Sequence, residues 1–157
     1  MRRIALASAA LIGVFALASP VAAMSPETEY FEFGGAGTQD CGTFLNHFEG
    51  HGSARVTTYF GADGEPLRAI VHASGSETEV NSVTLKTLDV RFRSTIKIDF
   101  ATGTWTETGA SIIAVDREEG IVIHDTGRVV FDADGTIVFV AGPHDALEFD
   151  AFCAALA

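Results

Sequence analysis

Apolar and polar residues alternate along much of the chain, most clearly over residues 89–100. One side of this segment is mostly apolar and comprises Val90, Phe92, Ser94, Ile96, Ile98 and Phe100. A two-residue repeat gives a strand one apolar face, which a helix cannot present with this spacing. At about 3.3 Å per residue the segment would be about 40 Å long, which suits a coiled or barrel sheet.

Gly-rich and Asp-rich breaks divide the chain into short periodic segments. The strands expected between these breaks are 44–60, 67–74, 77–85, 88–100, 104–115, 121–131 and 136–141. Gly50 and Gly52 are expected to bend or split the first of them. Because short loops leave no room for parallel crossovers, we predict an all-β fold. It is an antiparallel meander of about 8 strands closing into a small barrel.

Two segments predict the same hairpin turn. Ala62-Asp63-Gly64 and Ala133-Asp134-Gly135 each follow a strand that ends in an aromatic residue. This order suits a type I turn that Gly closes in the left-handed conformation. Beyond Pro143 the pattern changes to an Ala/Leu-rich run, and we predict a short C-terminal helix capped by His144 or Asp145. Its apolar face would comprise Leu147, Phe149, Phe152, Cys153 and Leu156.

The N-terminus has the three parts of a secretory signal peptide. Arg2 and Arg3 precede an apolar run over 4–18, and small residues lead to Ala23. The run is short of the about 20 residues that a membrane-spanning helix needs. We therefore expect a signal peptide over residues 1–23, a secreted, extracellular protein and no membrane span after cleavage.

The cysteines define the domain that follows the signal peptide. Residues 24–40 contain the run Gly34-Gly35-Ala36-Gly37 and are expected to form a flexible N-terminal segment, in which Tyr30, Phe31 and Phe33 could form a short strand. Cys41 and Cys153 have no second Cys or His at redox or metal-ligand spacing, so a disulfide is favoured over a catalytic thiol. Residues 41–157 are thus expected to form a single disulfide-closed β-barrel domain.

Charge excludes some classes of partner. After residues 1–23 the chain has 8 Lys and Arg against 21 Asp and Glu, a formal net charge of −13. A surface with this much negative charge repels the phosphate backbone of nucleic acids and anionic lipid headgroups. We therefore expect no nucleic-acid partner.

The polar side chains identify no catalytic centre. His47, Glu49 and His51 alternate and would share one side of a strand. Histidines four residues apart lie about 13 Å apart on a strand, too far for one metal unless Gly50 forms a bulge. No nucleophile elbow or phosphate-binding glycine loop is present. We expect no metal, no cofactor and no assigned catalytic residue, and a binding protein is favoured over an enzyme.

Two resemblances accompany these patterns. A signal peptide, the start Cys41-Gly42-x-Phe44, Gly-punctuated strands and a late Cys resemble the layout of small exported actinobacterial proteins of unknown function. Gly103-Thr104-Trp105 is similar to the Gly-x-Trp string of lipocalins, although there it lies on the first strand and here it follows the fourth or fifth. The resemblances imply export and a barrel-like fold, and transfer no catalytic residue.

These patterns favour a binding module for a small apolar ligand. Trp105, the sole Trp, is expected to begin a strand opposite Phe100. The expected ligand-binding residues are Phe92, Ser94, Ile96, Ile98, Phe100 and Trp105. One alternative is a barrel-type cyclase or isomerase, which resembles allene oxide cyclases and dirigent proteins in architecture. Another is an oligomerising protein of the cell envelope.

Overall fold

The computed structural model describes residues 24–145 and 150–157. The expected signal peptide, with Leu147 and Phe149 of the expected helix face, lies outside the described residues. The strands are β1 (Glu27–Asp40), β2 (Leu45–Phe60), β3 (Pro66–Asn81), β4 (Thr87–Asp99), β5 (Trp105–Asp116), β6 (Gly120–Phe131) and β7 (Ile137–Ala141). Helix α1 (Ala151–Leu156) ends the chain. No helix of the described part has the length and apolar character needed to cross a membrane.

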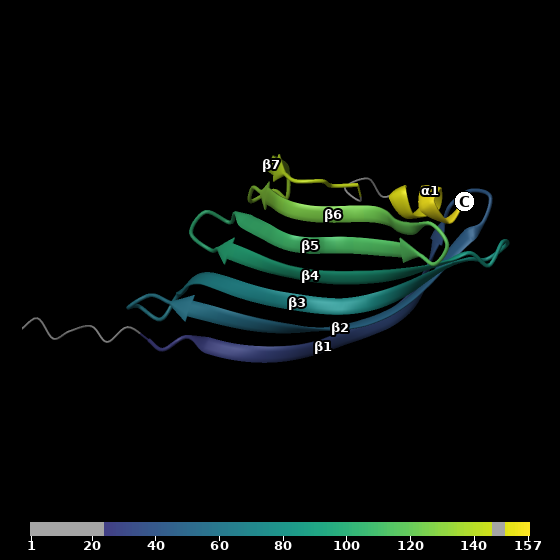
Figure 1. Ribbon diagram of the computed structural model, residues 1–157. Helices are drawn as coiled ribbons and strands as arrows, with labels where there is room; N and C mark the ends of the chain where they lie inside the picture. Colours follow the sequence, from purple (N-terminus) through teal and green to yellow (C-terminus); the bar gives the residue numbers. More distant parts are fainter. Residues whose placement is uncertain (1–23, 146–149) are drawn as a thin grey trace, which may run out of the picture.

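The seven strands form one antiparallel sheet in the order of the sequence, β1 to β7. Figure 1 shows β1 to β6 as long, curved ribbons that lie side by side, with the short strand β7 beside β6. The predicted all-β antiparallel meander with a short C-terminal helix is confirmed. Closure into a barrel is not shown, because the pairings of the described strands run only from neighbour to neighbour and none joins β1 to β7.

Strand β3 differs from the prediction of two strands separated at Ser74-Gly75-Ser76. It is continuous and pairs with β2 and β4 through this segment. Gly75 lies opposite Gly52 on one side and Phe92 on the other. A side chain at Gly75 would overlap the ring of Phe92. The glycine is therefore a close-packing position within a strand and not a break.

Residues 24–40, expected as a flexible segment, instead contain β1. All 14 of its residues pair with β2, from Glu27 opposite Thr58 to Asp40 opposite Leu45. Glycine costs backbone entropy in a strand, but the pairing with β2 supplies the hydrogen bonds that hold this one in register. Strand β2 also runs through Gly50 without a split or bulge there.

Both predicted turns are confirmed. Gly64 and Gly135 have φ angles of 85° and 79°, in the left-handed region. The amide of Gly64 donates to the carbonyl of Gly61, and the amide of Gly135 donates to the carbonyl of Asp132. Glycine adopts this conformation without the steric cost that a Cβ would add.

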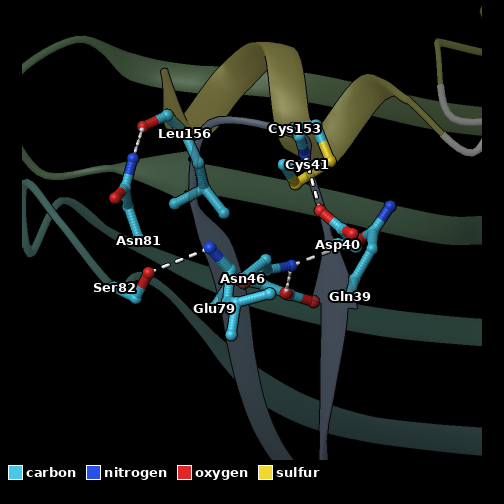
Figure 2. The surroundings of a disulfide bond; sticks show 11 residues. Gln39, Asp40, Cys41, Asn46, Glu79, Asn81, Ser82, Cys153 and Leu156 are labelled. Carbon is cyan, nitrogen blue, oxygen red and sulfur yellow. Dashed lines mark hydrogen bonds between the residues drawn. A yellow bond between two sulfur atoms is a disulfide. The ribbon is translucent and has the colours of Figure 1, made fainter.

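Helix α1 packs on the sheet at one end and is joined there to the end of β1 (Figure 2). The predicted disulfide is present: Cys41, just after β1, is bonded to Cys153 in α1, with the Cα atoms 5.4 Å apart. Leu156 is fully buried against the sheet, and its carbonyl accepts a hydrogen bond from Asn81 Nδ2. The core cluster comprises Leu88, Val90, Ala114, Ile123 and Leu156.

The cap of α1 differs from the prediction. Its N-cap is Asp150, which makes no side-chain capping hydrogen bond. His144 instead contacts Asp125 on β6, and Asp145 accepts a hydrogen bond from the backbone amide of His124. Both expected capping residues thus secure the chain after β7 to β6.

The register divides the sheet into two faces. We call the face that α1 packs against the inner face; on β4 it carries the residues predicted from the alternation, from Val90 to Ile98, and also Leu88. We call the opposite face the outer face; on β4 it carries Arg91, Arg93 and Lys97. Directly paired residues on neighbouring strands lie on the same face, so the pairings extend both faces across the sheet.

Candidate functional site

Three phenylalanine rings on the inner face lie over glycines of neighbouring strands. At each of these glycines an added Cβ would overlap the ring that covers it. The pairs are Phe33 over Gly52, Phe48 over Gly37 and Phe92 over Gly75. Because glycine has no side chain, each ring can lie against the backbone of the next strand.

Two of these rings meet above the glycines that separate them. Phe33, Gly52, Gly75 and Phe92 form one row across β1 to β4 in the register. The ring centroids of Phe33 and Phe92 are 6.0 Å apart, and the ring planes differ by 21°. This spacing is typical of an aromatic pair, so the row is an aromatic wall across the inner face.

A hollow of about 330 Å³ lies between this wall and Phe48. Its floor is the next row of the register, in which Gly35 pairs with Gly50 and Gly50 pairs with Glu77. No atom beyond its chain neighbours lies within 4 Å of a Cβ built on Gly35, so the space above this residue is open. The hollow is lined by Phe33, Gly34, Gly35, Ala36, Phe48, Gly50, His51, Ser76, Glu77 and Phe92.

Two carboxyl groups on β3 lie next to the hollow and next to each other on the inner face. Burial raises the pKa of Glu77, which lines the hollow. Burial also raises the pKa of Glu79; the hydrogen bond from Asn46 opposes the shift and the charge of Glu77 adds to it. Asn46 Nδ2 donates to Glu79 Oε2 and, over 3.3 Å, to Gln39 Oε1 (Figure 2). Asn46 Oδ1 is the buried side-chain polar atom without a partner in the described part of the chain.

We expect the variant Glu79→Gln to change how stability depends on pH. A carboxyl group whose pKa is raised by folding binds its proton more readily in the folded state. Its contribution to the free energy of unfolding therefore rises as the pH falls from neutral through the folded-state pKa. In Glu79→Gln this rise should be smaller than in the wild type, as measured by urea unfolding between pH 7 and pH 4.5. The uncharged exchange Thr78→Val, on the outer face, should leave the slope unchanged; equal slopes in wild type and Glu79→Gln would contradict the burial of this charge.

The structure places one of the predicted ligand-binding residues at the hollow. Phe92 lines it, whereas Ser94, Ile96 and Ile98 follow Phe92 along the inner face, farther from α1. Ser94 is buried. These residues share the predicted face, and only Phe92 contributes to this hollow.

Trp105 has a different partner from the one expected. It pairs with Ile98 on β4 and with Phe131 on β6, and its ring stacks on Phe131 with centroids 3.7 Å apart. Phe100 lies in the turn after β4 and is 45% exposed. The turn extends over several residues, so Trp105 lies opposite Ile98 instead of Phe100. Its aromatic contact therefore reaches across to the other neighbouring strand.

Sequence reasoning missed Phe33, Phe48 and the glycine floor. A signal was present, because Gly50 and Gly52 are two residues apart and so share one face of a strand. Glycine within a strand marks a close approach of another group. In β1 the run Gly34-Gly35-Ala36-Gly37 follows Phe33 directly, but a glycine run also suits mobile chain, and the prediction of a flexible segment leaves β1 out of the sheet.

The outer face carries the histidines considered for a metal. His47 and His51 share this face of β2, as predicted, and β2 has no bulge between them. Within residues 24–145 and 150–157, no group of three or more His, Cys, Asp or Glu could hold a metal ion. Comparison of the chain with known protein families, curated proteins and solved structures finds no match.

Proposed function

We propose that the protein binds a small apolar molecule in the hollow of the inner face. The observation that carries the proposal is the open space above Gly35 between the rings of Phe33, Phe92 and Phe48. Ligand sites are concave and mostly apolar, with few polar groups that fix orientation. The Cys41–Cys153 disulfide suits an oxidising compartment, and we place this activity outside the cell.

The shape and chemistry of the hollow favour a flat ligand with one polar group. A flat ring could lie on the backbone of Gly35, next to the Glu77 side chain that packs over Gly50, and contact the surrounding Phe rings at their edges or faces. Glu77 lies beside this floor, and its carboxyl can accept a hydrogen bond from a ligand N–H or O–H. Burial raises the pKa of Glu77 and so disfavours its carboxylate form. A basic group on the ligand would offset this effect by pairing with the carboxylate.

Binding is favoured over acid–base catalysis. Catalysis of that kind needs a proton donor or acceptor held within reach of a second positioned group. Among the described residues that line the hollow, Glu77 supplies a carboxyl group. His51 also lines it, but by register its side chain belongs to the outer face. The neighbouring Glu79 is engaged by Asn46. The hollow therefore has the apolar surface of a binding site and one group to orient a ligand.

The variant Gly35→Leu is expected to block binding without unfolding the sheet. A Cβ at this position has no neighbouring atom within 4 Å, so the leucine side chain would enter the open space above the floor. We expect the neutral apolar dye N-phenyl-1-naphthylamine to bind the wild type saturably, with a rise in dye fluorescence. Binding to Gly35→Leu should be weaker by about tenfold or more, since the leucine occupies the space the dye would fill.

Thr38→Leu is the matched control for this experiment. Thr38 lies on the same strand and is exposed on the outer face, so the same apolar side chain there does not enter the hollow. Dye affinity in Thr38→Leu should equal that of the wild type. Dye binding that is absent from the wild type, or equal in the wild type and Gly35→Leu, would refute the proposed site.

A further inference from the structure

Within the strands of this acidic protein, the Lys and Arg residues lie on one face. Of the eight Lys and Arg residues after position 24, six lie on strands of the outer face. They are Arg55, Arg68, Arg91, Arg93, Lys97 and Arg128. The strand residues of the inner face include no Lys or Arg in the described part of the chain; they include the carboxyl groups of Glu27, Glu29, Glu77, Glu79, Glu107, Asp116 and Asp125. The outer face also carries five strand carboxyl groups, those of Glu32, Asp40, Glu49, Asp89 and Asp99. Its strand residues are therefore close to neutral in sum, whereas those of the inner face are negative.

A second hollow, of about 730 Å³, lies on the outer face over β2 to β5. Small residues, Ser74, Gly109 and Ala110, form part of its lining. Arg55 and Arg93 line it from strands on either side of β3. Because both arginines line the same hollow, a ligand bound in it could contact both guanidinium groups.

The two guanidinium groups have no carboxylate partner. Opposite charges that face each other across paired strands stabilise a sheet, and Arg68 lies opposite Asp99 in this way. Arg55 instead lies between Tyr30 and His72, and Arg93 pairs with Ser74 and Ala110. Neither arginine forms an ion pair with any described residue.

The carboxyl group nearest to Arg55 on the outer face is that of Glu32 on the edge strand β1. Glu32 pairs with Ser53, which is the next outer-face residue along β2 from Arg55. Glu32 does not line the hollow. Asp89 lies four residues from Arg93 on the same face of β4. Its Oδ2 atom is 3.6 Å from Arg117 Nε, so it already has a partner. The charge of the two arginines is thus available to a ligand.

Hydroxyl and imidazole groups complete the lining. His72 Nδ1 lies 3.0 Å from Thr95 Oγ1, so the hydroxyl can donate to this nitrogen while Nε2–H remains a donor. The hydroxyl of Ser74 adds a second neutral donor. Thr108 Oγ1 donates to the carbonyl of Thr95 over 3.3 Å. The hollow therefore presents N–H and O–H donors around two fixed positive charges.

We propose that this hollow binds the phosphate or sulfate group of a small molecule. The planar guanidinium group matches the oxygens of such an anion and binds them in pairs. The hollow is several times larger than one phosphate group, and its hydroxyl lining suits a sugar attached to the anion. This site is separate from the inner face, and it does not depend on the function proposed there.

The proposal is tested by calorimetric titration of the whole secreted chain with three probes at low ionic strength. The probes are inorganic phosphate, inorganic sulfate and glucose 6-phosphate; the last distinguishes an anion carried on a sugar from a free anion. We expect saturable binding that weakens with added NaCl. In the double variant Arg55→Gln/Arg93→Gln, the affinity should fall by at least about tenfold, because both charge-assisted contacts are lost.

The matched control removes two positive charges from the same face outside the hollow. Arg68→Gln/Lys97→Gln changes the net charge equally, and its affinity should stay within about twofold of the wild type. An equal loss in both double variants would show that only overall charge matters, and it would overturn the proposal. No binding of any of the three probes to the wild type, with circular dichroism showing a folded sheet, would also overturn it. Glucose, titrated as an uncharged reference, should bind more weakly than glucose 6-phosphate, and equal binding of the two would also overturn the proposal.

Discussion

Replacing Cys41 and Cys153 together by serine is expected to lower the free energy of unfolding by about 4–5 kcal/mol. The disulfide closes a sequence separation of 112 residues, and a cross-link over so long a loop removes much entropy from the unfolded chain. It also holds α1 against the sheet, and a helix of six residues is not stable alone. Urea unfolding followed by the fluorescence of Trp105 measures the difference.

The reduced wild type is the matched control for this variant. It keeps both sulfur atoms and loses only the bond, so its stability should agree with that of Cys41→Ser/Cys153→Ser. The amide of Ala154, which donates to the carbonyl of Asp150 in the helix, should exchange with solvent faster in both. A loss below about 1 kcal/mol would contradict the assigned role, because the loop-entropy term alone is several times larger.

Replacing His144 by alanine is expected to cost about 3–5 kcal/mol, because it leaves a buried carboxylate without its partner. His144 Nδ1 lies 2.5 Å from Asp125 Oδ1, and the two side chains are only 4% and 5% exposed. The other ring nitrogen, Nε2, lies 3.2 Å from the carbonyl of Ala141. The pair therefore joins β6 to the chain that leaves β7. Urea unfolding of His144→Ala tests this expectation.

A double-mutant cycle separates the pair from its surroundings. Asp125→Asn/His144→Ala removes the buried charge and should be more stable than His144→Ala. The two single losses should add to more than the loss in the double variant, as they do for groups in contact. Strict additivity would show that the two side chains do not act as a pair.

The parts of the fold that follow from local pattern were predictable. The two-residue alternation of β4 gave its inner face correctly, and the Ala-Asp-Gly turns near Gly64 and Gly135 have the expected conformation. The disulfide followed from the number of cysteines. Each of these features depends on neighbouring residues or on composition, so one sequence is sufficient to infer it.

Glycine explains most of what could not be predicted. At Gly75 and in β1, glycines that suggested breaks are strand residues. Gly75 accommodates a ring from the adjacent strand, Phe92, which is distant in sequence. The two-residue alternation shows which residues share a face within one strand. The register between strands determines which phenylalanine ring lies over which glycine. Because register depends on the pairing between strands, the hollow was not visible in any single segment.

The separation of charge had the same cause. Composition gives only the sum of the charges, and that sum predicted a surface that repels anions. Arg55 and Arg93 share the outer face because β2, β3 and β4 pair in one particular register. The distance between these two arginines depends on the order of the strands and on which face each residue occupies. Neither can be obtained from the net charge.

Two-dimensional amide NMR of the secreted protein, titrated with N-phenyl-1-naphthylamine, tests the binding site of the inner face most directly. We expect the largest shift changes at Gly35, Gly50 and Glu77, which form one row across β1 to β3. Changes confined to the exposed edge strand β7, or spread evenly over the sheet, would contradict a site between the three phenylalanine rings.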